Sequence, residues 1–238
     1  LTIDERIQRV AQAALQEQVD AYDAEGGYAV VMDVKSGDIL AMANTPSFDP
    51  NRFRRYESED WRLRPITDTF EPGSVFKSFV AAAALEEEAI SLATPIDCEE
   101  GYLQIGRHGI RDTHQHDVLT AAEVIQKSSN IGAYKIAQKI GKKRLYQYIR
   151  AFGFGRRTGL GIRGEQPGLI RSPDGWADVT FANIAFGQGL TATPLQVTRA
   201  LGALANDGLL LRPQIIKEVR TPSGRRLRRG SPTLQRRV

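Results

Sequence analysis

The feature that most constrains the fold is an almost entirely apolar helical segment from Ser74 to Glu88, which carries a lysine, Lys77, near its start. A helix that is apolar nearly all round has to be buried on every side. The rest of the chain must therefore supply a core around it, and 238 residues are enough to do so. A lysine at the head of such a helix loses its hydration, so the sequence indicates that it has a specific task.

Composition excludes several classes of protein. Apolar residues make up 41% and charged residues 25%, as in ordinary globular domains, which argues against a disordered or collagen-like chain. The longest apolar run, residues 79–85, is far shorter than the roughly 20 residues of a membrane span. The net charge of +4 comes from six arginines after residue 220, and this tail has no aromatic residue to stack on bases. We therefore expect no nucleic-acid partner.

The periodicity of apolar residues predicts an α+β domain, with strands near the two ends of the chain and helices between them. A helix opened by a capping box of Thr2 and Glu5 precedes a hairpin of strands 28–34 and 39–43. Residues 45–70 and 153–175 are expected to be loops. Further helices are predicted from Ser74 to Glu88, from Thr120 to Lys127, over 131–140 and 142–152, and from Thr193 to about Asn206. The second of these is opened by a capping box of Thr120 and Glu123. Strands 209–211 and 215–219 are expected to pair before the arginine-rich tail.

Ser74 and Lys77 form the first candidate site. A spacing of three places both side chains on one face of a helix, and Glu71-Pro72-Gly73 suits a turn that delivers Ser74 to the helix N-terminus. Free N–H groups there stabilise developing negative charge. Burial lowers the pKa of an amine, so a neutral Lys77 could take the proton of Ser74.

Ser128-Ser129-Asn130 is the second candidate. Alone, this triplet is typical of a helix end followed by an asparagine cap. Because it follows Lys77 across a predicted helical segment, the two motifs together supply the serine, lysine, serine and asparagine of active-serine acyl transferases.

These two motifs make the chain resemble a known family. The segments at 71–77 and 126–132 are similar to the first two motifs of penicillin-binding protein transpeptidase domains. The segments at 1–4, 37–44, 151–155, 187–189 and 193–196 agree, so the similarity runs the whole length. It is greatest to class B, division-type (septal) enzymes, which implies the penicillin-binding and serine β-lactamase-like fold, with an antiparallel sheet and a helical lobe.

The resemblance implies a role for each motif residue. Ser74 is the nucleophile, Lys77 its base, Ser128 a proton carrier, and Asn130 a holder of the substrate amide and of Lys77. The implied substrates are peptidoglycan stem peptides ending in D-Ala-D-Ala, and β-lactams are the implied inhibitors. No cofactor or metal is implied. The family also implies other cell-division proteins as partners, and a location on the periplasmic face of the inner membrane, through an N-terminal anchor that precedes this chain.

One departure from the family pattern concerns its third motif, Lys-Thr/Ser-Gly, which does not occur after Asn130. We therefore expect residues 1–238 to be a transpeptidase domain that lacks its C-terminal strands, and to be impaired as an enzyme. A serine β-lactamase and a non-catalytic β-lactam sensor are the alternatives. The first is disfavoured because no separate loop carboxylate suited to activating water is evident.

Several other patterns have simpler interpretations. Lys35-Ser36-Gly37 has the letters of the third motif, but it lies in the predicted hairpin turn. Residues 159–164 spell a dinucleotide fingerprint, yet no strand precedes them and Pro167-Gly168 prevents the following helix. His114 and His116, with Asp112 and Asp117 nearby, are expected to be solvated rather than to hold a metal. Cys98 stands among carboxylates, which raise a thiol pKa, so we expect a structural role.

Overall fold

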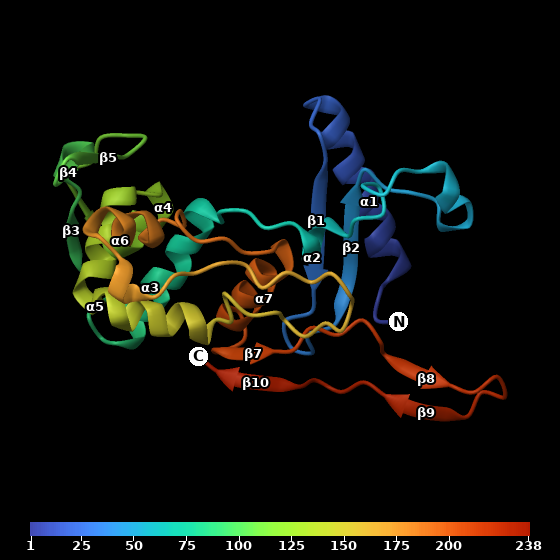
Figure 1. Cartoon of the computed structure of the whole chain (residues 1–238). Coiled ribbons are helices and arrows are strands. Elements are labelled where there is room, and N and C mark those ends of the chain that lie inside the picture. Colours follow the sequence, from blue (N-terminus) through green and yellow to red (C-terminus); the bar gives the residue numbers. More distant parts are fainter. The chain divides into compact units, whose positions relative to one another are not determined.

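Two units, each assembled from separate segments of the chain, make up the computed structural model, which describes residues 1–238 (Figure 1). The first unit contains residues 1–70, 156–168 and 192–238. The second contains residues 71–155 and 169–191. Helices and antiparallel strand pairs occur together, as the α+β expectation requires.

The first unit begins with helix α1 and the hairpin of β1 and β2. Their bounds, with those of the short helices that follow, are α1 Glu5–Ala21, β1 Gly27–Met32, β2 Ile39–Thr45, η1 Pro50–Arg55 and α2 Arg64–Thr67. The predicted hairpin is confirmed, and Lys35-Ser36-Gly37 lies in its turn, where the Gly37 N–H donates to Asp33 O at 2.8 Å. The fingerprint-like residues 159–164 form no helix or strand.

The predicted capping box at the start of α1 is wrong. Asp4 is the N-cap and accepts hydrogen bonds from the N–H groups of Arg6 and Ile7. Thr2 is instead buried, and its hydroxyl donates to Ile39 O at 2.7 Å. Asp and Thr are both good caps, so the choice was decided by a contact with β2 that the local pattern does not contain.

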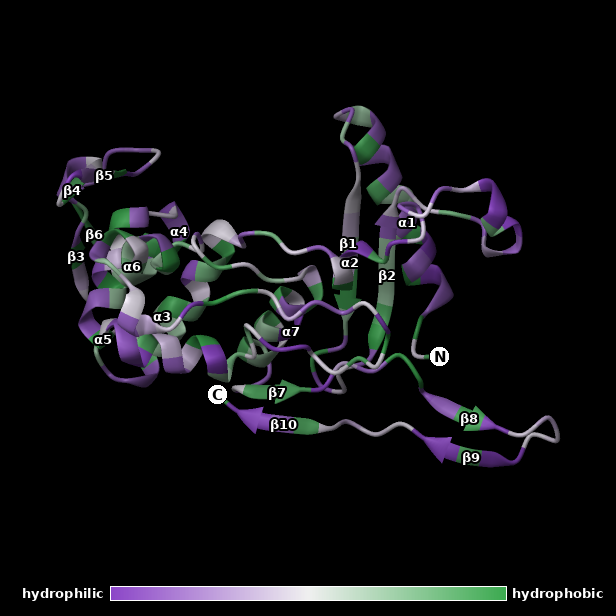
Figure 2. Ribbon diagram, viewed as in Figure 1, coloured by the Kyte–Doolittle hydropathy of each residue, from purple (hydrophilic) through white to green (hydrophobic).

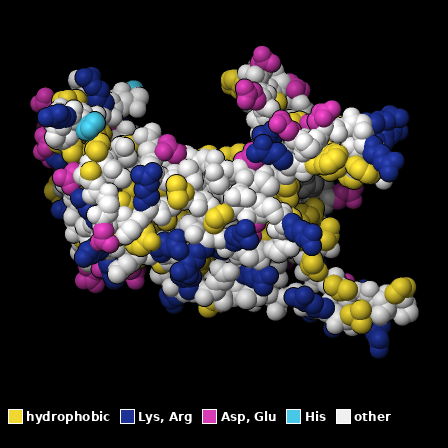
Figure 3. All heavy atoms as spheres, in the orientation of Figure 1, with side chains coloured by type: hydrophobic (Ala, Val, Ile, Leu, Met, Phe, Trp, Pro, Cys, Tyr) yellow, Lys and Arg dark blue, Asp and Glu magenta, His cyan; other side chains and the backbone are white.

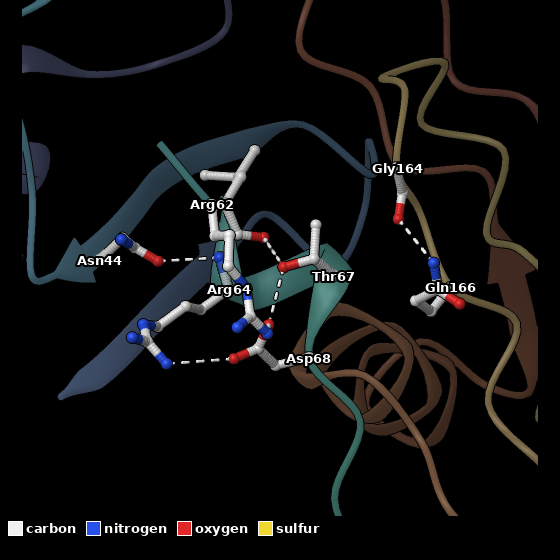
Figure 4. Close-up of polar contacts among 8 residues, drawn as sticks. Asn44, Arg62, Arg64, Thr67, Asp68, Gly164 and Gln166 are labelled. Carbon is white, nitrogen blue, oxygen red and sulfur yellow. Dashed lines mark hydrogen bonds and ion pairs between the residues drawn. The ribbon is translucent and has the colours of Figure 1, made fainter. Parts of the chain in front are cut away.

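Helix α2 lies in the predicted loop 45–70 and is tied down by polar contacts (Figure 4). The Arg64 N–H donates to Asn44 Oδ1 at 2.8 Å, and Arg62 and Arg64 pair with Asp68 at 2.6 and 3.2 Å. Ile66 in this helix is fully buried with Ile39, Leu160 and Leu195, which form a core cluster of the first unit.

The C-terminal strands pair differently from the prediction. The elements of this part are α7 Pro194–Leu204, β7 Leu209–Leu211, β8 Glu218–Arg220, β9 Arg226–Arg229 and β10 Leu234–Arg237. β7 pairs with β10, and β8 pairs with β9, so the expected pairing of 209–211 with 215–219 is wrong. The strands β9 and β10 lie in the arginine-rich tail and are mostly hydrophilic in Figure 2, so they lack the apolar alternation from which strands are predicted.

The second unit carries most of the helical residues expected in the middle of the chain. Its elements are η2 Gly73–Phe76, α3 Lys77–Glu86, β3 Pro95–Asp97, η3 Glu99–Gly101, β4 Tyr102–Ile105, β5 His108–Arg111, β6 Val118–Thr120, α4 Ala121–Lys127, α5 Asn130–Ala151, η4 Pro173–Gly175 and α6 Asp178–Ala185. The predicted cap of Thr120 with Glu123 is confirmed at the start of α4. Helix α6 was not predicted, because its eight residues are too few to show a clear helical periodicity.

Helix α3 is buried, as its apolar sequence predicts. Phe76 and Phe79 pack with Phe152 and Phe154, whose ring centroids lie 5.0–5.3 Å from theirs. All four rings are buried, so the turn that carries Ser74 rests on a close-packed aromatic cluster.

Gly141 explains why the sequence indicates two helices where α5 runs continuously. Its φ of 77° and ψ of 164° interrupt the helical backbone, and side-chain-bearing residues essentially never adopt this combination. The predicted break is therefore confirmed as a kink within α5. No helix of the chain is long and apolar enough to cross a membrane.

Candidate active site

Ser74 lies in a 3-10 turn, η2, and not in the first turn of the α-helix that the sequence predicts. A loop of the same unit, residues 187–189, holds this turn in place by hydrogen bonds. The Gly73 N–H donates to Gly187 O at 2.9 Å, and the Gly189 N–H donates to Glu71 Oε1 at 2.8 Å. The side chain of Ser74 is exposed, as a nucleophile for an external substrate has to be.

Gly187 cannot be replaced by a larger residue without moving this turn. A Cβ at this position would lie 2.1 Å from Gly73 O and 2.7 Å from the Cβ of Phe76. Its φ of 81° also disfavours side-chain-bearing residues. The glycine therefore permits the close approach that braces the residue before Ser74.

Lys77 is buried, with 2% of its surface exposed, and its ammonium contacts the second motif. Nζ donates to Ser128 O at 2.5 Å and to Ser128 Oγ at 2.9 Å. Burial lowers the pKa of Lys77 to about 8, and the carboxylate of Asp112 opposes this shift. At pH 7 roughly a tenth of this lysine is therefore neutral, which is enough for it to act as a base.

Ser128 meets Lys77 because α4 ends there. Its φ of 59° and ψ of 39° are left-handed, which turns the chain sharply between α4 and α5. The next residue, Ser129, is buried and caps α5 by accepting from the Gly132 N–H at 2.8 Å. The predicted break between the two helices is confirmed, and the turn at this break places Ser128 in hydrogen-bond contact with Lys77.

Asn130 and Ser74 line one cleft of about 360 Å³ within the second unit. The Asn130 side-chain amide donates to Arg111 O at 3.0 Å. The cleft is bounded by Gly73, Ser74, Gly109, Ile110, Arg111, Asn130, Asn183, Phe186 and Gln188. The four predicted residues thus form two neighbouring pairs, with Ser74 and Asn130 in the cleft, and Lys77 and Ser128 in hydrogen-bond contact.

Three further polar residues line the cleft and were not candidates from the sequence: Arg111, Asn183 and Gln188. Arg111 ends β5, and its guanidinium lies 5.0 Å from the centroid of the Tyr102 ring. Asn183 belongs to α6, which the periodicity does not reveal. Gln188 stands between two glycines that marked the family resemblance, which was the one available signal.

Asp112, considered above only beside the histidines, instead contacts the second motif. Its Oδ1 accepts from the N–H groups of Asn130 and Ile131 at 2.5 and 3.1 Å, and its Oδ2 accepts from Ser129 Oγ at 2.5 Å. No cluster of three His, Cys, Asp or Glu side chains suited to a metal occurs in the chain.

Cys98 is buried beside this network, with its Sγ 3.5 Å from Ser129 Oγ. Burial is the main cause that raises the thiol pKa, and the charge of Asp112 adds to it. The expected direction is therefore right, but burial contributes more than the neighbouring carboxylates of the sequence. An un-ionised, enclosed thiol is a poor nucleophile.

Comparison with known proteins agrees with the motifs. Residues 27–238 match the family described as "Penicillin binding protein transpeptidase domain". A probable peptidoglycan D,D-transpeptidase PenA of Neisseria meningitidis is 39% identical over 95% of this chain and 39% of its own length. Penicillin-binding protein PbpB of Mycobacterium tuberculosis is 39% identical over 98% of this chain and 34% of its own length. The chain thus spans less than half of either relative.

Solved structures extend the likeness to the fold. Penicillin-binding protein 3 of Mycobacterium tuberculosis, solved in complex with ampicillin, has a TM-score of 0.89 and 38% identity, over 98% of this chain and 52% of that one. The same protein complexed with aztreonam has a TM-score of 0.88. The transpeptidase domain of Burkholderia pseudomallei penicillin-binding protein 3 has a TM-score of 0.84 and 30% identity, over 99% of this chain and 64% of that one. By its motifs, its fold and these similarities, the chain belongs to the transpeptidase-domain family of class B penicillin-binding proteins.

Proposed function

We propose that the protein is a peptidoglycan D,D-transpeptidase that cross-links stem peptides through an ester on Ser74. The observation that carries this proposal is the contact of the buried Lys77 with Ser128, beside a cleft that exposes Ser74. Ser74 supplies a nucleophile, Lys77 with a pKa near 8 supplies a base three residues later, and Ser128 in contact with Lys77 supplies a route for the proton.

In the first step Ser74 Oγ attacks the carbonyl of the penultimate D-Ala of a stem peptide ending in D-Ala-D-Ala. The hydroxyl proton passes to the neutral amine of Lys77. The amide bond to the terminal D-Ala breaks, and its nitrogen takes a proton from Ser128, which Lys77 replenishes. The products of this step are an acyl ester on Ser74 and free D-Ala.

In the second step an amine of another stem peptide attacks the ester carbonyl. Its proton returns through Ser128 and Lys77 to Ser74 Oγ, and a new amide bond joins the two stems. Asn130, in the cleft wall, holds the amide of the bound peptide. A β-lactam acylates Ser74 by the same first step, because its ring amide stands in for the dipeptide bond.

The wider role also belongs to this proposal. We place the whole protein in septal wall synthesis with other cell-division proteins, on the periplasmic face of the inner membrane, and take residues 1–238 to be part of its transpeptidase domain. The support is the resemblance of the motifs to division-type enzymes. A fluorescent fusion of the full-length protein that stays away from division sites would contradict the septal role.

Covalent labelling by a fluorescent penicillin tests the chemistry. Ser74→Ala in the full-length protein is expected to abolish labelling, while Ser78→Ala, on the next turn of the same segment, keeps it. Transfer of a D-Ala-D-Ala peptide to an added amine then separates a transpeptidase from a sensor or a β-lactamase. Undiminished labelling of Ser74→Ala would remove Ser74 as the nucleophile.

A further inference from the structure

Asp112 stands between two parts of the candidate site without belonging to any of its motifs. It directly follows β5, and its own N–H donates to Gly101 O at 3.0 Å, so its backbone is anchored to the end of η3, directly before β4. Its carboxylate reaches the start of α5 and accepts three hydrogen bonds there, from Ser129 Oγ and from the N–H groups of Asn130 and Ile131.

These contacts exceed what capping of α5 requires. Ser129 already acts as the local cap through the Gly132 N–H. Asp112 adds a carboxylate from a residue 18 positions earlier, bound to the backbone of Asn130 itself. The Asn130 side chain is bound to the adjacent Arg111 O, so residues 111 and 112 together hold Asn130 by its backbone and by its side chain.

We propose that Asp112 is a positioning residue that holds the Ser128–Asn130 turn in place against Lys77 and Ser74. The proposal deepens, and rests on, the transpeptidase chemistry argued above. Charge-assisted hydrogen bonds of this kind are short and directional, so they fix Ser129 and Asn130, the residues that directly follow Ser128, while Ser128 contacts Lys77. Misplacing a reacting group by about 1 Å costs on the order of a hundredfold in rate.

The negative charge of Asp112 has a second effect, on Lys77. It is the charged group that raises the pKa of this lysine against the effect of burial. The surrounding elements carry other charged side chains, among them Glu86 on α3, Asp97 on β3, Glu99 on η3, Arg111 on β5, Glu123 and Lys127 on α4, and Lys135 on α5, but Asp112 is the charged group that shifts the pKa of Lys77. Lys135 is engaged with Asp97 and Glu99, and Arg111 lies over Tyr102. Removal of the Asp112 charge therefore lowers the pKa of Lys77.

Two variants of the full-length protein test this role. Asp112→Asn keeps the size but loses the charge, and is expected to slow acylation by a penicillin by about tenfold to a hundredfold. The acylation rate is expected to rise with pH as Lys77 loses its proton. This rising part of the pH–rate profile, its acidic limb, is expected to lie at lower pH in Asp112→Asn than in the parent. Asp112→Glu keeps the charge but displaces the carboxylate, so acylation slows while the limb stays in place.

Asp117→Asn is the matched control, because it removes an exposed carboxylate from the same loop and is expected to match the parent in both respects. A carboxylate that only stabilised the fold would leave the folded variants with the parental acylation rate at pH values where Lys77 is neutral. Parental acylation with an unmoved limb in Asp112→Asn would overturn the proposal. If that variant does not fold by circular dichroism, Asp112→Glu decides, and a parental rate in it overturns the proposal. If Ser74→Ala loses penicillin labelling but Asp112→Asn behaves like the parent, the positioning role of Asp112 is refuted while the proposed function stands.

Discussion

At the scale of single residues, the proposed mechanism depends most on Lys77. An ammonium ion buried among apolar side chains is costly, and two hydrogen bonds to Ser128 offset only part of that cost. The remainder is expressed as a pKa lowered to about 8. The same burial that makes the lysine unfavourable as a cation makes it available as a base.

The first residue-scale prediction concerns pH. A protonated amine cannot accept the proton of Ser74, so acylation is expected to fall about tenfold for each pH unit below about 8. Above that pH the rate levels off, because Lys77 is already neutral. Second-order acylation rates with a penicillin, measured from pH 6 to 9.5 on folded protein, test this. A rate that is flat or declines with rising pH would contradict the assignment.

The second residue-scale prediction separates a base from a fixed charge. Lys77→Arg keeps the positive charge, but a guanidinium does not lose its proton near neutral pH. Acylation is expected to drop by about a hundredfold or more, the scale of positioned general-base catalysis. Lys139→Arg, on the exposed side of α5, is the control and keeps the parental rate. Equal rates for both variants would mean that Lys77 acts only through its charge.

At the scale of elements, the sequence predicts a helix or strand correctly where the residues that determine it lie within one short segment. The cap of Thr120 with Glu123 begins α4 as predicted, because the partners are three residues apart, and α7 begins after Thr193 as predicted, where Thr193 and Gln196 form a second capping box. The arginine-rich strands β9 and β10 were missed because they lack apolar alternation, and β10 also pairs with β7 and not with its neighbour in the chain. In Figure 3 Lys and Arg side chains are scattered over the visible face and not gathered in one patch.

The element-scale prediction concerns the kink in α5. Gly141→Ala is expected to reduce the free energy of unfolding by about 1–3 kcal/mol, the usual cost of forcing a side-chain-bearing residue into this backbone region. A Cβ there meets no atom within 4 Å, so the cost is conformational and not steric. Gly175→Ala is the matched control, since its Cβ also meets nothing and its φ is not positive. Urea unfolding of both variants measures the difference, and equal midpoints would contradict the argument.

At the scale of the whole molecule, the predicted site residues all fall within one of the two units. Ser74, Lys77, Ser128 and Asn130 belong to the second unit, and so does Asp112. The first unit holds the β1–β2 hairpin, which has two strands only. A family-type third motif is not found after Asn130 in these 238 residues.

The whole-molecule prediction follows from that motif. By analogy with the family, the Ser74 N–H is one oxyanion donor and a strand carrying Lys-Thr/Ser-Gly supplies the other. Loss of one such donor costs about 10²- to 10³-fold in rate. Residues 1–238 alone are therefore expected to react with a penicillin at least about 10²-fold more slowly than the full-length protein. Side-by-side acylation of both, each verified as folded, tests this, and equal rates would show that the site is complete within residues 1–238.

The sequence by itself determined the α+β class, the β1–β2 hairpin, the buried helix α3 and the family, because each depends on residues that are close together in the chain. It also predicted Ser74, Lys77, Ser128 and Asn130 as candidates, through the spacing within two short motifs. Only the tertiary structure decided that Lys77 contacts Ser128 and that Asp112 holds Asn130. These partners lie 51 and 18 residues apart, and what brings them together is the packing of α3, α4 and the β4–β5 hairpin around the start of α5, which no local periodicity encodes.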